Sequence, residues 1–165
     1  MLFFPESFKM STPSDREVLV TRDFHAPRQL VFDAFTKPEL VRRWLLGPAG
    51  WTMPVCEIDL RVGGRYRYGW RKAGVKDMGM SGEFREVLPA SRIVCTEAFD
   101  DAWYPGEALN TTDFVEANEL TRVTITVRYE STEARAIAME SGMERGMTAG
   151  FNRLEAVLAS LPPAG

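Results

Sequence analysis

The sequence contains few of the residues from which metal centres and disulfide frameworks are built. Its 165 residues include two cysteines and one histidine. Cys56 and Cys95 form no CxxC pair, and His25 lies between a predicted strand and a predicted helix. A zinc site would have at most three scattered ligands, and a nucleophile–histidine device would have to recruit His25. We therefore expect no metal, no cofactor and no catalytic residues of these types, and we expect both thiols to be free and buried.

Net charge and long apolar runs are also scarce. The formal net charge is −3 at pH 7, which is too small to attract nucleic acid or an acidic membrane. No apolar run approaches the ~20 residues of a membrane span. The first ten residues lack the basic leader and cleavage site of a secretory signal. These features predict a cytoplasmic protein that binds neither nucleic acid nor membrane.

The length and composition fit a single globular domain. A chain of 165 residues, 45% of them hydrophobic, can bury roughly two-thirds of the surface of its unfolded form. Met10, followed by Ser-Thr-Pro-Ser-Asp, resembles a second start of the chain. We therefore assign residues 1–15 to an N-terminal extension and residues 16–162 to one domain.

Hydrophobic periodicity predicts an α+β fold. The first strand is expected at residues 17–24, followed by two short helices at 28–36 and 38–45. Six further strands are then predicted at 55–60, 65–71, 78–87, 92–99, 111–117 and 122–129. One long helix is predicted at 133–161. No crossover helix separates the later strands, so the sheet must be antiparallel. We expect a curved seven-stranded sheet whose apolar face is covered by the C-terminal helix, with space for a ligand between them.

Several segments resemble one known family. They are Thr21–Pro27, Phe32, Pro38-Glu39, Trp44, Asp59–Gly64, Gly82-Glu83-Phe84 with Pro89, and Ser141–Gly146 through Leu154. Together they resemble the bacterial activator-of-heat-shock-protein-90-ATPase-like family of the SRPBCC (START-like) helix-grip superfamily, over residues 17–161. The resemblance implies a helix-grip fold with a deep cavity between sheet and helix. Its implied functions vary, because the superfamily includes lipid carriers, hormone receptors, aromatase/cyclases and chaperone activators.

Aromatic and sulfur-containing side chains are the candidate ligand contacts. They are Trp44, Trp51, Tyr66, Tyr68, Trp70, Met78, Met80, Phe84, Cys95, Glu97, Trp103, Met139, Met143, Met147 and Phe151. Core packing would explain any single aromatic residue equally well. Strand parity groups Glu97 with Ile93 and Cys95, so we expect its carboxyl to point inward. Trp103 lies in a turn-rich loop, where it forms either a lid over the cavity or a local surface contact.

Three functions are compatible with these residues. The first is a protein that holds an apolar or aromatic small molecule without reacting with it. The second is a cyclase or dehydratase that uses strand carboxylates as acid and base, drawn from Glu57, Asp59, Glu83, Glu86 and Glu97. The third is an interaction module whose partner is a chaperone ATPase.

Glycines and charged clusters have simpler explanations. We expect Asp59 and Arg61 to pair locally at a strand end rather than to anchor a ligand. The basic residues of the second hairpin are expected on its solvated face, rather than against an acidic partner: Arg65, Arg67, Arg71, Lys72 and Lys76. Gly142, Gly146 and Gly150 recur every four residues, which suggests close approach of the sheet or of a ligand. We expect Gly146 to pack against the sheet, so that alanine there overpacks the core, and Met143 to face the cavity.

Overall fold

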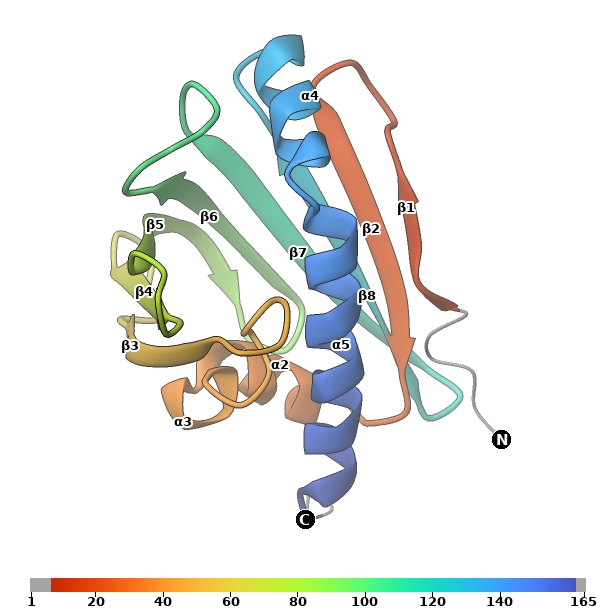
Figure 1. Ribbon diagram of the computed structural model, residues 1–165. Coiled ribbons are helices and arrows are strands. Elements are labelled where there is room, and N and C mark those ends of the chain that lie inside the picture. The colour runs from red at the N-terminus through yellow and green to blue at the C-terminus, as the bar shows by residue number, and fades with distance from the viewer. Residues whose placement is uncertain (1–6, 163–165) are drawn as a thin grey trace.

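A computed structural model describes residues 7–162, which form one curved antiparallel sheet with helices on its concave face (Figure 1). The strands are β1 (Lys9–Ser11), β2 (Glu17–Phe24), β3 (Thr52–Ile58), β4 (Arg65–Arg71), β5 (Met78–Leu88), β6 (Arg92–Phe99), β7 (Ala108–Ala117) and β8 (Leu120–Arg128). The helices are α2 (Arg28–Thr36), α3 (Pro38–Val41), α4 (Thr132–Glu140) and α5 (Met143–Ser160). The α+β helix-grip architecture predicted from the sequence is confirmed.

The sheet has eight strands, not the seven predicted. Their order is β1-β2-β8-β7-β6-β5-β4-β3, and every neighbouring pair is antiparallel. The additional strand is β1, which pairs Met10 with Val20. Residues 9–11 therefore belong to the sheet rather than to an extension outside it, whereas residues 1–6 lie outside the described residues. Hydrophobic alternation could not reveal β1, because three residues are too short to show a period of two.

The predicted single helix over residues 133–161 is two helices. The first, α4, begins as expected with a capping Ser131, whose hydroxyl accepts a hydrogen bond from the Ala134 amide at 3.0 Å. The second begins after Gly142, which has a φ of 88°. Because this left-handed conformation ends a helix and favours glycine, the chain breaks between α4 and α5. Other differences are small: α3 ends at Val41 rather than residue 45, β3 begins at Thr52, and β7 begins at Ala108.

Helix α5 covers only part of the concave face. It lies over β2, β7 and β8, whereas the ribbon of β3, β4 and β5 curves away from it (Figure 1). Phe24 of β2 meets Phe151 of α5 edge-to-face, with ring centroids 5.7 Å apart. The part of the interior between α5, α2 and strands β2 and β8 is called the closed half below. Its side chains Val18, Phe24 and Leu154 have 0% exposure.

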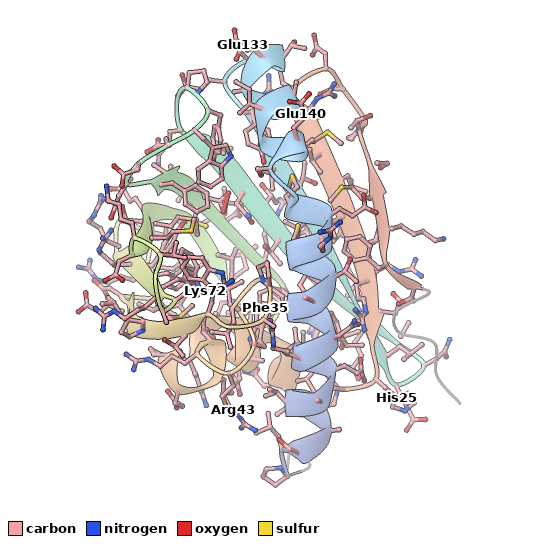
Figure 2. The ribbon with its side chains drawn as sticks, viewed as in Figure 1. His25, Phe35, Arg43, Lys72, Glu133 and Glu140 are labelled. Atoms are coloured by element: carbon pink, nitrogen blue, oxygen red, sulfur yellow. The ribbon has the colours of Figure 1, made fainter. Side chains whose placement is uncertain are left out.

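The helices α2 and α3 close one end of the interior. Figure 2 shows Phe35 of α2 close to α5, and Arg43 after α3 at the end of the molecule opposite to Glu133 and Glu140 of α4. The Phe35 ring packs against Trp44 at 4.8 Å and against Phe114 at 5.3 Å. These contacts fix the two short helices against the sheet.

The three helix glycines have three different environments. Gly142 forms the break, and a Cβ on Gly150 would lie 3.3 Å from the Trp44 carbonyl oxygen. A Cβ on Gly146 would meet nothing within 4 Å. The expectation that Gly146 packs closely against the sheet is therefore wrong. Only Gly146 and Gly150 belong to α5, because Gly142 precedes it in a left-handed conformation, so the spacing of four did not describe one continuous helix face.

Among the described residues, none of the helices is both long enough and apolar enough to cross a lipid bilayer.

Candidate functional site

The alternation of β4 separates an aromatic face from a basic face. Tyr66, Tyr68 and Trp70 point to the concave side, and Arg65, Arg67 and Arg71 alternate with them and point outward. Arg67 pairs with Asp100 and Arg71 with Asp77 on the outer side. The basic cluster is therefore a solvated face on which acidic residues balance two of the arginines, as the simpler explanation predicted.

The loop between β3 and β4 also has a structural explanation. Arg61 pairs locally with Asp59 at 2.9 Å, and both side chains are more than half exposed. A Cβ on Gly64 would clash with the carbonyl oxygen of Asp59, so the turn requires glycine at this position. Asp59 and Arg61 thus pair locally, as expected.

Glu97 lies on the concave side between two small residues. Its β7 partner is Ala108. On β5 it lies level with Gly82, between the pairs Ser81–Ala98 and Phe84–Cys95. A side chain on Gly82 would meet the Tyr66 ring at 2.6 Å and the Thr96 carbonyl. The space that a Gly82 side chain would need is thus taken by the Tyr66 ring and the Thr96 carbonyl, whereas on β7 the short Ala108 side chain lies beside Glu97.

The carboxyl of Glu97 is held by an oriented amide. Asn110 hydrogen-bonds the carboxyl, and the Asn110 Oδ1 accepts a hydrogen bond from the Thr112 hydroxyl at 3.1 Å. Because Oδ1 is used by Thr112, the amide group of Asn110 is the end left to donate to Glu97. Burial raises the pKa of Glu97 to about 7, and the Asn110 bond opposes that rise. The inward orientation predicted from strand parity is therefore confirmed.

The other titratable groups around Glu97 remain neutral near pH 7. Burial raises the pKa of four tyrosines above the usual phenol range, and the nearby Glu97 adds to the rise in each: Tyr66, Tyr68, Tyr104 and Tyr129. Burial also raises the pKa of Cys95 to about 12. Tyr66 donates its hydroxyl hydrogen to the Thr96 carbonyl at 2.6 Å. Glu97 is consequently the group of this cluster that changes charge near neutral pH.

Six aromatic rings form a continuous series around Glu97, and they are called the aromatic arc below. In order they are Tyr66, Tyr68, Trp70, Phe99, Tyr104 and Tyr129. Successive ring centroids are 5.0, 5.9, 6.4, 6.3 and 5.3 Å apart. These separations are typical of packed aromatic pairs. All four tyrosines of the arc are coupled electrostatically to Glu97. The carboxyl thus lies within reach of both ends of the arc.

The structure brings together only some of the predicted ligand residues. Those that are only partly buried are Tyr68, Trp70, Cys95, Glu97, Met143 and Met147. Those buried in the packed core are Trp44, Tyr66, Met80, Phe84 and Phe151. The indole of Trp44 donates to the Ala34 carbonyl at 2.9 Å, which explains its burial. Met78, Trp103 and Met139 are exposed. Trp51 lies near the β4–β5 turn, with the Lys72 ammonium 6.0 Å from its ring.

Three residues of this region were not predicted as ligand contacts. Phe99 shares the strand parity of Cys95 and Glu97, so that parity could have identified it. Tyr129 follows the inward-pointing Val123, Ile125 and Val127 at the same spacing and could have been found in the same way. Asn110 carries no such signal, because β7 was expected to begin at residue 111.

Two surface hollows are also found, and Ala108 and Tyr129 line the smaller one. One of about 790 Å³ is lined by residues including Arg28, Arg92 and Glu116, and a second of about 230 Å³ includes Arg85 and Arg128. Neither is lined by a predicted ligand residue. Within residues 7–162, no group of three or more His, Cys, Asp or Glu side chains is placed to hold a metal ion.

Comparisons with known proteins agree with this architecture. A structure of a protein from Rhodobacter sphaeroides superimposes with a TM-score of 0.88 at 27% identity, covering 93% of this chain and 99% of that one. A protein from Chromobacterium violaceum, also 27% identical, gives 0.77 over 88% and 98% of the two chains. An AHSA1-like protein from Aeromonas hydrophila, at 19% identity, gives 0.68 over 89% and 99% and so shares the fold. No protein with a curated description matches this chain.

The family assignment rests on a match to a sequence model. Residues 25–159 match the model described as "Activator of Hsp90 ATPase homolog 1-like protein". The match includes α2 and α3, strands β3 to β8, and nearly all of α5. It also includes Glu97 and the whole aromatic arc. The chain therefore belongs to the Activator of Hsp90 ATPase homolog 1-like family.

Proposed function

We propose that this protein binds an apolar or aromatic small molecule between the inner face of β4–β6 and the helices α4 and α5, without catalysing a reaction on it. The observation that carries the proposal is the incomplete burial of large side chains on this inner face. Tyr68, Trp70 and Phe99 each keep accessible surface, although they point to the side on which the rest of the sheet is closed. Water contact with three such rings is unfavourable, and a ligand that covered them would remove it.

The helix side of the proposed site is adaptable. Met143 and Met147 are half-buried at the start of α5. The Met143 sulfur accepts a hydrogen bond from the Tyr129 hydroxyl at 3.8 Å. Flexible thioethers can adjust to ligands of different shape. Gly146, between the two methionines, has open space where its Cβ would be, so this stretch of helix leaves room beside it.

Trp103 forms part of the mouth in this proposal. Its side chain is 39% exposed, and its ring packs against Phe99 at 4.4 Å and Tyr104 at 5.6 Å. Phe99 and Tyr104 both belong to the aromatic arc. The geometry thus favours a lid that rests on the site over an isolated surface contact.

Native mass spectrometry tests the proposal. Protein purified from its own host should carry an additional non-covalent mass, and N-phenyl-1-naphthylamine, a neutral fluorescent probe, should bind the emptied protein. Met143→Ala should weaken probe binding at least threefold with little loss of stability. Met10→Ala, in β1, is the matched methionine control and should leave probe binding unchanged. If the protein retains no additional mass and also fails to bind the probe at saturating concentration, the proposal is contradicted.

A specific observation also supports a second candidate function. Glu97 has a pKa raised to about 7, which suits a residue that gives and takes a proton near neutral pH. A cyclase or dehydratase would use it as acid and base. The test is turnover: an enzyme of this type would convert its bound compound, whereas Glu97→Gln would bind that compound without converting it.

The family description supplies a third candidate, stimulation of a chaperone ATPase. That function requires contact between surfaces, so it should persist when the inner site is filled by the neutral probe. ATPase assays with a bacterial chaperone of this class, with and without probe, distinguish it from the leading proposal. A cytoplasmic location, where such a chaperone would be met, is part of all three proposals.

A further inference from the structure

We infer that the aromatic arc around Glu97 is a recognition site for an organic cation, an amine or quaternary ammonium group carried by an apolar or aromatic body. The inference rests on the proposed function and specifies the chemical class of its ligand. It depends on three features: an arc of π-faces, a carboxylate inside the arc, and the lack, within residues 7–162, of a cationic partner for that carboxylate.

The rings give the site a preference for positive charge. The faces of Trp, Tyr and Phe carry negative electrostatic potential and attract ammonium groups. The six rings of the arc follow one another at 5.0–6.4 Å. Because burial keeps the four phenols neutral, they contribute ring faces and hydroxyl dipoles rather than charges.

The carboxyl of Glu97 is the charged group at the centre. Its neighbours on the adjacent strands, Gly82 and Ala108, bring no charged or polar side chain to it. Its one hydrogen-bonding partner in the described part of the chain is the neutral amide of Asn110. No lysine, arginine or histidine of residues 7–162 acts on its pKa, which is governed by burial and by Asn110. A bound cation would therefore supply the counter-charge that the fold does not.

The opposite ligand classes fit less well. An anion would be repelled by ionised Glu97, and no lysine, arginine or histidine of residues 7–162 acts on that carboxyl to offset the repulsion. A neutral carbonyl compound could accept a hydrogen bond from protonated Glu97, and its binding would then weaken as the pH rises. A cation needs ionised Glu97, so its binding should strengthen as the pH rises. The sign of the pH dependence separates the two.

The groups that face Glu97 do not obscure this dependence. From β4 it is faced by Tyr66 and Tyr68, from its own strand by Cys95, and from the chain around β7 and β8 by Tyr104 and Tyr129. Burial holds the pKa of each above the range of the experiment, so each stays neutral. From α5, Met143 contacts Tyr129 of this cluster, and Met143 does not titrate.

The experiment compares benzyltrimethylammonium, whose charge does not depend on pH, with its neutral isostere neopentylbenzene. Binding of each is measured by NMR shifts of the indole and aromatic protons at pH 6 and pH 8. With a Glu97 pKa of about 7, the cation should bind about tenfold more tightly at pH 8. Neopentylbenzene should bind equally at both pH values.

Two variants complete the test. Glu97→Gln preserves the size and hydrogen bonding of the side chain, so it should lower cation affinity at pH 8 at least tenfold and abolish the pH dependence. Glu57→Gln, at an exposed position of β3, is the matched control and should change neither. Circular dichroism confirms folding, and the pH profile of the unmodified protein gives an independent readout if Glu97→Gln does not fold.

The outcomes are distinct. Equal affinity for cation and isostere, or cation binding unaffected by Glu97→Gln, would overturn this inference and leave the proposed function intact. If both probes and N-phenyl-1-naphthylamine fail to bind, the proposed function itself is wrong, and the inference falls with it.

Discussion

The two halves of the interior each contain a buried ionisable side chain, and the fold treats them differently. In the closed half, Arg22 of β2 is 1% exposed. Its guanidinium donates to the Asn152 amide oxygen at 3.0 Å and interacts electrostatically with Glu155. In the open half, which is the inner face of β4–β6, Glu97 has an amide for a partner and rings around it. Where α5 covers the sheet, it supplies Glu155 as the counter-charge of Arg22. Where α5 leaves the sheet uncovered, no such counter-charge from the described residues is placed near Glu97.

The difference follows from helix coverage. Arg22 is reached by Asn152 and Glu155, which lie one turn apart on α5. Burial raises the pKa of Glu155 to about 7, and Arg22 opposes that rise. No comparable helix turn reaches Glu97. The closed half, which is tightly packed and has Glu155 near Arg22, supports the fold. The open half lacks both features, so its rings and its carboxyl are available to a ligand.

The largest expected effect contrasts one apolar residue from each half. Leu154→Ala removes a side chain with 0% exposure and should lower the free energy of unfolding by about 2–5 kcal/mol. Met147→Ala, at a half-buried position of the same helix, should cost less than about 1 kcal/mol, because little packing is lost. Urea denaturation measures both. Equal losses would show that the open half is as tightly packed as the closed one.

The second prediction concerns the pH dependence of stability. The pKa of Glu97 is about 7 in the folded protein against an ordinary value of 4.5, so the folded state binds the proton more strongly. Stability should therefore fall as the pH rises from about 4.5 to about 7. Glu97→Gln should leave stability unchanged at pH 4.5 and raise it at pH 8 by about 1–2 kcal/mol, less than the full shift implies because the Glu97 residue is partly exposed.

Thermal unfolding at several pH values measures this effect. Glu155, whose pKa is also about 7, contributes a slope of the same sign, so Glu97→Gln should reduce the pH dependence without removing it. Glu57→Gln should follow the unmodified protein at every pH. If the stability of Glu97→Gln also follows that of the unmodified protein at every pH, then Glu97 is not desolvated in the folded state.

The smallest effect compares two glycines of α5. Gly146→Ala places a methyl group in open space and should stabilise the protein by about 0.5–1 kcal/mol through helix propensity. Gly150→Ala gains the same propensity, but its methyl group meets the Trp44 carbonyl at 3.3 Å, so its net gain should be smaller or negative. The melting temperatures of the two variants show which substitution stabilises the protein more. A higher melting temperature for Gly150→Ala would mean that the open space lies at Gly150 rather than at Gly146.

Strand parity and helix periodicity predicted most of the fold from the sequence. The inward direction of Glu97 followed from its spacing to Ile93 and Cys95, because the period of a strand is fixed by its geometry. The packing of Gly146 could not be predicted in this way. Periodicity says which residues share a helix face, but not where along that face the sheet ends.

The candidate site was predictable only within single strands. Tyr68 and Trp70 belong to one alternating strand and were identified. The neighbour relation between Glu97, Ala108 and Gly82 depends on register across three strands, and the bond from Asn110 depends on where β7 begins. Registers are set by turns and by a bulge between Phe84 and Glu86, which no local pattern reveals.

The break at Gly142 allows α4 to unfold locally and independently of α5. Nine residues are too few to sustain a helix alone, and α4 has only Ala134 and Ala138 buried against the rest of the molecule. An uninterrupted helix would share the protection of α5, whereas this one can open and close while α5 stays folded. Its backbone amides should exchange with deuterium orders of magnitude faster than those around Leu154. A ligand resting on the methionines beside the break would slow that exchange, so α4 is a built-in reporter of whether the open half is occupied.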